Sequence, residues 1–138
     1  MASILKVDTI TGVATAGSIA ITGEGNSTTT NLQQGLAKSW INVKGTGTAS
    51  SDMIRDSFNI SSDTDNGTGN YTFAFSSNMN NDDYAAGSGV SGSTDAGNFN
   101  PAGICNRTTS NYVMDIENAS SVGTDPGIGD ATIFGDLA

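Results

Sequence analysis

The sequence predicts an all-β protein: an antiparallel β-sandwich preceded by an extended N-terminal arm and one short helix. Apolar and polar residues alternate with a period of two in segments 39–44, 71–75 and 110–118, as they do in half-buried strands. Glycine-rich turns separate these short segments at the spacing of an antiparallel sandwich. The regions expected from this pattern are an arm over 1–30, a helix over 31–38 and a β-sandwich over 39–138.

Composition limits the core that one chain can build. Leu, Ile, Val and Phe number 4, 11, 6 and 5, which is 26 of 138 residues. Below about 20% of these residues, and with a high net charge, a chain usually stays disordered because it buries too little apolar surface. We therefore expect neighbouring copies or another protein to supply part of the core.

Charge and residue types exclude several functions. The chain has 5 Lys plus Arg against 14 Asp plus Glu, a formal net charge of −9, which repels nucleic-acid phosphates and anionic membranes. There is no histidine, so the usual general base and the commonest metal ligand are missing. The single Cys105 allows no internal disulfide. No apolar run approaches the roughly 20 residues of a membrane span, and the start MASILKVD does not resemble a secretory signal.

The first 30 residues are expected to lie on another surface. Residues 3–10, SILKVDTI, alternate loosely and contain β-branched residues, which suits a short strand or an extended segment. Residues 11–30 are small and polar, and only Val13, Ile19 and Ile21 could anchor them. A solvated linker is the alternative that this composition leaves open.

One short helix is expected over residues 31–38. Either of two preceding threonines can cap it, and Leu32 and Leu36 lie four residues apart on one face. Gly35 weakens the helix by about 1 kcal/mol relative to Ala. A helix of this length is not stable alone, so we expect both leucines to pack against partners.

The strands of the sandwich follow from the period-two pattern. In segment 39–44, Ile41 and Val43 face one side while Trp40 and Asn42 face the other. Segment 52–61 is expected to be a further strand, whereas residues 77–103 have few apolar anchors and are expected to form long surface loops. The apolar residues expected on the buried faces are Ile41, Val43, Ile54, Phe58, Ile60, Tyr71, Phe73, Phe75, Tyr112, Met114 and Ile116.

The acidic stretch DTDNGTGN at 63–70 admits two interpretations. Asp63 and Asp65 have the spacing of the first ligands of a calcium loop, but no glutamate follows at the twelfth position and no helices flank the stretch. Asn66-Gly67 between alternating segments is a strong hairpin signal, because both residues tolerate positive φ. We predict a turn, with weak metal binding at Asp63 and Asp65 left open.

Two other motifs resemble binding sites. GSGVSG at 87–92 matches G-x-G-x-x-G, but a dinucleotide site needs a strand before it and a helix after it, and the sequence indicates neither. In a chain with 18 glycines, chance explains this match. Asp82 and Asp83 could bind a hard cation weakly, although a solvated loop explains them better.

No set of catalytic residues stands out. Asp115 and Glu117 share one side of a strand, a geometry that a glycosidase could use, but an exposed strand face explains them much better. Cys105 lacks a histidine to activate it. We predict a protein without enzymatic activity, cofactor or dedicated metal site.

Three stretches resemble a module of bacteriophage tail fibres, especially those of phages of marine bacteria. They are GLAKSWINVKGTGT at 35–48, IRDSFNISSDTDNGTGNYTFAFSSNM at 54–79 and IFGDLA at 133–138. In that family a lysine and a tryptophan lead into a strand, R-D-S-F-N follows, and D-N-G-T-G turns into a strand with alternating aromatic residues. The N-terminal SILKVDTI resembles the virion-attachment end of such fibres. The similarity covers most of residues 1–79 and is weak across 80–130.

The resemblance implies a structural protein of the virion, assembled in the host cytoplasm as a homotrimer, with no nucleic-acid binding and no membrane insertion. Its arm would dock on tail or capsid proteins, and its β-domain would project towards a host glycan or protein. The docking residues would be Ile4, Leu5, Val7 and Ile10, the contacts between copies Leu32, Leu36 and Trp40, and the receptor surface Tyr84, Phe99 and Asn100. A capsid fibre or decoration protein without a receptor is the alternative, and a glycan depolymerase dependent on Asp115 is a third, less favoured hypothesis.

Overall fold

The computed structural model describes residues 5–12, 19–23, 28–46, 52–91, 102–118 and 120–137. The chain divides into two compact units, Met1–Leu36 and Ala37–Ala138. The N-terminal unit contains β1 (Ala20–Thr22), β2 (Thr29–Asn31) and α1 (Leu32–Gly35). The C-terminal unit contains β3 (Ala37–Val43), β4 (Ile54–Phe58), β5 (Ile60–Gly67), β6 (Asn70–Phe75), β7 (Ala85–Ser91), β8 (Ala102–Cys105), β9 (Asn111–Ile116) and β10 (Ile128–Phe134).

The N-terminal unit is a small antiparallel ladder followed by one helical turn. β1 pairs with β2, with Ile21 opposite Thr30, and the backbone N–H of Leu32 donates to the carbonyl of Ile19 at 2.9 Å. The helix is shorter than the expected 31–38, because it ends at Gly35 and the backbone enters β3 at Ala37. Pairing of Ala37 with Phe134 of β10 captures residues that were expected to continue the helix.

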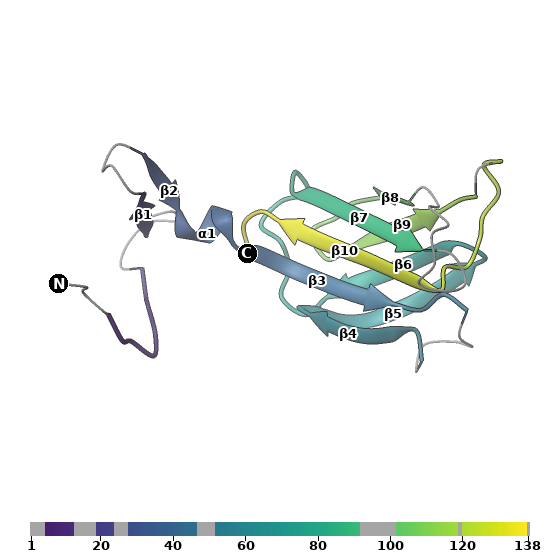
Figure 1. Cartoon of the computed structure of the whole chain (residues 1–138), viewed down its shortest axis with the longest axis horizontal. Helices are drawn as coiled ribbons and strands as arrows, with labels where there is room; N and C mark the ends of the chain where they lie inside the picture. The colour runs from purple at the N-terminus through teal and green to yellow at the C-terminus, as the bar shows by residue number, and fades with distance from the viewer. Residues whose placement is uncertain are drawn as a thin grey trace. The chain divides into compact units, whose positions relative to one another are not determined.

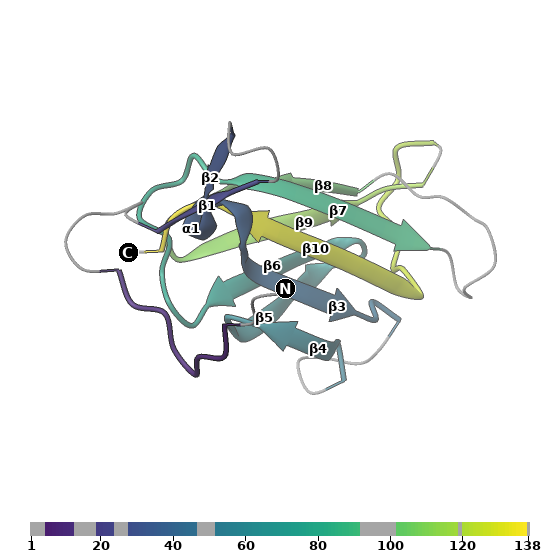
Figure 2. The ribbon, with the colours of Figure 1, turned by 60° about the vertical axis from the view of Figure 1, so that its left-hand side comes forward.

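The C-terminal unit is an antiparallel sandwich of two four-stranded sheets, ordered β4-β3-β10-β7 and β5-β6-β9-β8 (Figures 1 and 2). All strand pairs within the two sheets are antiparallel. The predicted all-β sandwich is therefore confirmed. We call the first sheet the β3 sheet and the second the β6 sheet.

The core lies between the two sheets and is rich in aromatic rings. Alternate residues of β6, namely Tyr71, Phe73 and Phe75, are buried as predicted. The ring of Tyr112 lies 5.6 Å from both Phe73 and Phe75, centroid to centroid, within the range at which aromatic pairs attract. The other residues of the cluster are Ile41, Val43, Met53, Met79, Tyr84, Val90, Met114, Ile116, Ala131 and Ile133.

The sandwich core is built by a single chain, which changes the inference drawn from composition. All 3 tyrosines of the sequence are core residues, and so are three of its 4 methionines. A tally of Leu, Ile, Val and Phe omits these side chains, although a buried tyrosine or methionine removes as much apolar area from water as a leucine does. Neighbouring copies are therefore not needed to complete the interior of this unit.

Asn59 carries the chain from one sheet to the other. The expected single strand over 52–61 is divided here: β4 belongs to the β3 sheet and β5 to the β6 sheet. Asn59 has a φ of 59°, a left-handed conformation that asparagine tolerates better than most residues. Its side-chain amide donates to the carbonyls of Lys38 and Ser77 at 3.0 Å each, and its side-chain oxygen accepts the N–H of Ser77 at 2.7 Å.

A register shift within β4 changes the side on which Phe58 lies. Phe58 was expected on a buried face with Ile54 and Ile60. It is instead 50% exposed on the outer side of β4, while Ile54 and Ile60 pack partly buried against the core. Between the pairs Asn42–Asp56 and Val43–Ile54 the register shifts, which makes Arg55 an extra residue and reverses the alternation along β4, and a continuous period of two does not anticipate this.

The stretch at 63–70 forms a hairpin, as predicted, but its turn lies two residues later. The loop between β5 and β6 is Thr68-Gly69, with Gly67 paired to Asn70. The register shifts between Asp65 and Gly67, so Asn66 forms a bulge rather than the turn. Gly67 and Gly69 take the positive φ values, 125° and 75°.

The expectation of long surface loops across 77–103 is wrong for much of that range. Met79 and Tyr84 are core residues, and 85–91 forms β7 at the edge of the β3 sheet. Its sequence AAGSGVS hides the alternation, because alanine, glycine and serine differ little in hydropathy. The glycine motif at 87–92 thus begins inside a strand. Residues 92–101 lie outside the described residues.

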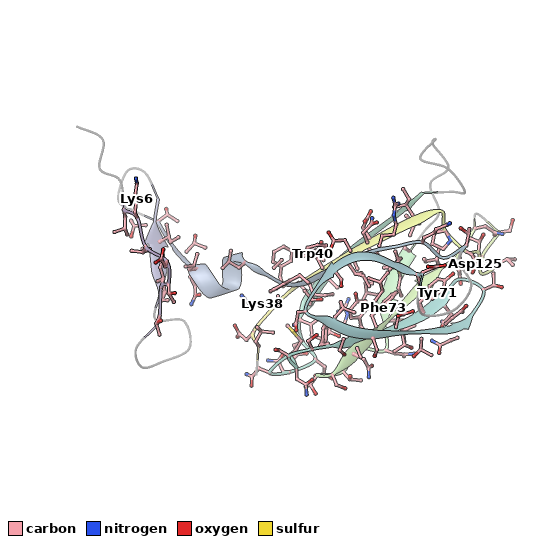
Figure 3. All side chains as sticks on the ribbon, turned by 90° about the horizontal axis from the view of Figure 1, so that it is seen from below. Lys6, Lys38, Trp40, Tyr71, Phe73 and Asp125 are labelled. Atoms are coloured by element: carbon pink, nitrogen blue, oxygen red, sulfur yellow. The ribbon has the colours of Figure 1, made fainter. Side chains whose placement is uncertain are left out.

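A polar contact ties three loops together at one end of the sandwich. The hydroxyl of Tyr71 donates to Oδ1 of Asp125 at 2.6 Å, and the backbone N–H of Gly69 donates to the same oxygen at 2.8 Å (Figure 3). The N–H of Gly45 donates to the carbonyl of Pro126 at 2.9 Å. We call Tyr71, Asp125, Gly69 and Gly45 the loop clasp.

Candidate functional site

The arm residues expected to dock on the particle are exposed wherever the structure describes them. Leu5, Val7 and Ile10 are 81%, 52% and 57% exposed. Their segment, residues 5–12, contains no helix or strand. Ile4 lies outside the described residues. Three large apolar side chains on irregular backbone are therefore available to a partner.

The three residues expected at contacts between copies fall in two different units. Leu32 and Leu36 belong to the N-terminal unit, where Leu32 is partly buried and Leu36 is 53% exposed. Trp40 belongs to β3 in the sandwich and is 37% exposed. The helical spacing that related Leu32 to Leu36 does not continue beyond Gly35, where the helix ends.

Tyr84 does not form an exposed receptor surface. It is 2% exposed, its ring stands edge-on to Phe75 at 5.8 Å, and its hydroxyl donates to the carbonyl of Asn111 at 3.2 Å. Arg107 lies 5.9 Å above the ring. The segment before β7 folds inward because Tyr84 and Met79 supply core side chains. Phe99 and Asn100 lie outside the described residues.

The most unusual exposed surface is the outer face of the β3 sheet. Trp40 and Phe58 lie directly opposite each other on β3 and β4, and Phe134 is two residues from Thr132, the partner of Trp40 on β10. The three aromatic side chains are 37%, 50% and 40% exposed. In Figure 3, Trp40 lies outside the sandwich, whereas Tyr71 and Phe73 lie within it. Three exposed aromatic residues on one sheet face are uncommon on a surface with no partner.

A row of polar side chains borders this aromatic cluster. Asn42 lies opposite Asp56 on one side and Asp130 on the other, two residues along the strands from Trp40. The side-chain amide of Asn42 donates to Oδ1 of Asp130. Because alternate residues of a strand share a face, this row and the aromatic cluster lie on the same outer face of the sheet.

The fourth strand of the sheet leaves this face open. Gly87 lies opposite Thr132, and Gly89 lies opposite Asp130. The row of residues that contains Trp40 and the row that contains Asn42 therefore both end on a glycine, which has no side chain. A Cβ placed on either glycine would meet nothing within 4 Å. We call the surface formed by Trp40, Phe58, Phe134, Thr132, Asn42, Asp56, Asp130, Gly87 and Gly89 the outer aromatic face.

Sequence reasoning placed Trp40 on this side of β3 with Asn42, which is confirmed. It missed Phe58 and Phe134. A usable signal exists for Phe134, because in ATIFG the aromatic residue follows Ile133 and must point to the opposite side of the strand. Phe58 had no such signal, since its orientation relative to Ile54 depends on the register shift at Arg55 within β4.

The outer face of the β6 sheet carries a shallow groove of about 360 Å³. Ala102, Gly103 and Cys105 of β8 line it, together with Asp115 and Glu117. The two acidic residues therefore share one side, as predicted. Burial raises the pKa of the Cys105 thiol, and the neighbouring Asp115 raises it further, so the thiol stays protonated near neutral pH.

The acidic pairs do not assemble a metal centre in the part of the chain that the structure describes. Asp63 faces the interior opposite Phe73, and Oδ1 of Asp65 accepts the N–H of Gly67 at 2.9 Å. Asp82 and Asp83 are exposed in the segment before β7. Within the described residues no three His, Cys, Asp or Glu side chains come together as metal ligands. Those residues also include no helix with the length and hydropathy to cross a membrane.

Comparisons with protein-family models, with curated proteins and with solved structures found no match to this chain.

Proposed function

We propose that the chain is a non-enzymatic structural protein of a bacteriophage particle, similar to a tail fibre, with an N-terminal arm that docks on the particle and a β-sandwich that projects for host attachment. The observation that carries the proposal is the division of the chain into two units with different surfaces. The N-terminal unit offers exposed apolar residues on irregular backbone, and the other unit is a self-contained sandwich with an exposed aromatic face.

The arm has the properties of a segment that is ordered by a partner. Exposing Leu5, Val7 and Ile10 to water is unfavourable by about 25 cal/mol for each Å² of apolar surface. A partner groove or sheet edge would bury these side chains and would also form hydrogen bonds with the backbone of residues 5–12. Docking on another virion protein supplies such a partner.

Association of copies is the second part of the proposal. Leu36 is 53% exposed directly after a helix of four residues, too short to be stable by itself. We place the contact between copies of a homotrimer at Leu32 and Leu36, in agreement with the tail-fibre resemblance. Trp40, the third residue expected there, lies on the outer aromatic face of the other unit.

Adsorption to host cells tests the attachment role and separates it from a decoration role on the capsid. The purified full chain is incubated with cells of the bacterium that supports the phage, and bound protein is quantified before the phage is added. An attachment protein adsorbs saturably and lowers the number of plaques. If the protein is found on particles but neither adsorbs nor competes, it is a decoration protein instead.

A further inference from the structure

We infer that the outer aromatic face binds a neutral glycan, with Trp40 and Phe58 stacking on a sugar ring and with Asn42 and Asp130 hydrogen-bonding to its hydroxyl groups. The inference rests on the proposed attachment function, because it names the class of host molecule and the surface that would contact it. The sequence placed Trp40 at contacts between copies, and no residue of this face was expected at the receptor surface.

The aromatic residues give the face a stacking platform. Trp40 and Phe58 are cross-strand partners, and directly opposed residues have Cβ atoms about 4.5–5.5 Å apart, so the two aromatic side chains are neighbours on this face. Each remains substantially exposed, at 37% and 50%. The C–H groups on one face of a pyranose ring are apolar and lie flat on such a patch, where they lose contact with water.

The adjacent row supplies directional hydrogen bonds. Asn42, Asp56 and Asp130 lie side by side across three strands, two residues from Trp40 along β3. Two residues of a strand span about 7 Å, which suits neighbouring sugars of a linear glycan that follows the strand direction. The bond between Asn42 and Oδ1 of Asp130 fixes both groups before a ligand arrives. Carboxylate oxygens accept from sugar hydroxyls, and the amide both donates and accepts.

The glycine positions explain how an extended ligand fits. Gly87 and Gly89 continue the aromatic and polar rows onto β7, and space for a Cβ is open above both of them. A chain of sugars that follows the strand direction therefore meets no side chain of β7 at these two rows. Substituting either glycine by a large residue would block this path without disturbing the core.

Charge favours a neutral glycan over a second copy of this chain. The face carries Asp56 and Asp130, and each copy has a net charge of −9, so two copies brought together here would place like charges near one another. Charged residues are also depleted from the centre of protein–protein interfaces. Acidic glycans are disfavoured for the same reason. This assigns Trp40 to a ligand and leaves the contact between copies to Leu32 and Leu36.

The experiment uses the fact that Trp40 is the only tryptophan of the chain. Its fluorescence and its quenching by acrylamide are measured on the full chain during titration with neutral oligosaccharides of glucose, mannose, galactose and xylose, and with a uronic-acid oligosaccharide for comparison. At least one neutral oligosaccharide is expected to shift the emission and to protect Trp40 from quenching, whereas the uronic-acid oligosaccharide does neither.

Variants locate the site. Phe58→Ala, Asn42→Ala and Gly87→Leu should each weaken the fluorescence titration about tenfold or more, and Trp40→Ala should do so by calorimetry. Val122→Ala is the matched control, because Val122 is 57% exposed but lies outside the two sheets. It should leave the affinity unchanged. Circular dichroism and urea unfolding confirm that each variant is folded, so that loss of binding is not loss of structure.

Three results would overturn the inference. The first is that no neutral oligosaccharide in the panel affects Trp40. The second is that the outer-face variants and Val122→Ala bind alike. The third is that Trp40 becomes shielded when the protein is concentrated without ligand, which would assign the face to a second copy. A protein that adsorbs to host cells but fails the first test loses only this inference. A protein that binds glycan but is absent from particles loses the proposed virion function instead.

Discussion

Two core tyrosines differ in what their hydroxyl groups contact. The hydroxyl of Tyr71 donates to Asp125 at 2.6 Å within the loop clasp, whereas the buried hydroxyl of Tyr112 has no hydrogen-bond partner in the described structure. Burial raises the pKa of both phenols, and the nearby carboxylate of Asp125 raises that of Tyr71 further. Both hydroxyls therefore remain protonated, and only the first contributes a hydrogen bond to stability.

Removing the two hydroxyl groups in turn tests this difference. We expect Tyr71→Phe to lower the free energy of unfolding by about 1–3 kcal/mol, because it leaves a carboxylate oxygen of Asp125 with one donor fewer. Tyr112→Phe should be neutral or slightly stabilising, because it removes an unsatisfied buried group. Urea unfolding of both variants measures the difference. If both variants lose the same free energy of unfolding, the hydrogen bond between Tyr71 and Asp125 in the loop clasp does not stabilise the fold.

Asp63 is the one carboxylate of the described residues with a buried, unpaired oxygen. It lies on β5, at the edge of its sheet, and faces inward opposite Phe73. Burial raises the pKa of Asp63, and its own backbone N–H lowers it by a smaller amount. An inward-pointing charge on an edge strand disfavours edge-to-edge pairing between molecules. This explains why a carboxylate that is unfavourable to bury occupies this position.

The raised pKa predicts a definite dependence on pH. A carboxyl group whose pKa is higher in the folded protein than in the unfolded chain contributes its stability below the unfolded value of about 3.9 and loses it as the pH rises through the folded value. Asp63→Asn should therefore be more stable than the natural chain at pH 7, and the advantage should shrink towards pH 4. Urea unfolding at both values measures this.

The exposed Asp82→Asn is the control for the change in net charge. If it gives the same gain at pH 7 as Asp63→Asn, then general charge repulsion, rather than burial of Asp63, explains the result.

At the scale of elements, the β5–β6 hairpin shows how glycine positions fix a turn. Gly69 has a φ of 75°, and a Cβ there would meet the backbone carbonyl of Ile116 and, at 2.6 Å, the N–H nitrogen of Thr124. Two independent constraints, conformation and space, thus require glycine. Gly87 on β7 has neither constraint, because its φ is ordinary and the space above it is open.

Alanine at the two glycines should separate these constraints. We expect Gly69→Ala to lower the free energy of unfolding by more than about 2 kcal/mol, since it combines left-handed strain with overpacking against backbone. Gly87→Ala should change it by less than about 0.5 kcal/mol. Thermal unfolding of both variants is the measurement, and a mild effect at Gly69 would mean that the hairpin moves freely relative to the loop after β9.

The sequence predicted elements well where large and small residues alternate. β3, β6 and β9 carry Val, Ile, Tyr, Phe and Met at every second position, and their buried faces are as expected. β7 was missed because alanine, glycine and serine give no contrast between faces. The crossover at Asn59 was missed because a left-handed residue inside an apparently continuous strand pattern has no signature in hydropathy.

The candidate site was only partly predictable for the same reason. Trp40 stands out as an aromatic residue in phase with the polar Asn42. Its neighbours Phe58 and Phe134 come from strands separated from it in sequence and brought beside it by the pairing of β4 and β10 with β3. Which strands are neighbours is a property of topology that a single sequence does not display.

At the scale of the whole molecule, the sandwich and the N-terminal unit have different requirements. The sandwich has a complete core of its own, so it should fold without partners. The N-terminal unit has exposed strands, one helical turn and exposed apolar residues, so its order should depend on contact with copies or with the particle.

Light scattering after size-exclusion chromatography tests the association of copies. The full chain should have the mass of three chains, and Leu32→Asn with Leu36→Asn should shift it to that of one chain while the sandwich remains folded. Leu5→Asn, on the arm, is the control and should leave the mass unchanged. A monomeric full chain at high concentration would contradict the trimer.

The most direct test of the docking arm is the protein content of purified particles that carry a chain without residues 1–30. We predict that the shortened chain is soluble and folded in the lysate, because the sandwich core lies wholly within Ala37–Ala138, but is absent from the particles when they are assayed by quantitative mass spectrometry. Particles carrying the shortened chain at the same level as the full chain would contradict a docking role for the arm.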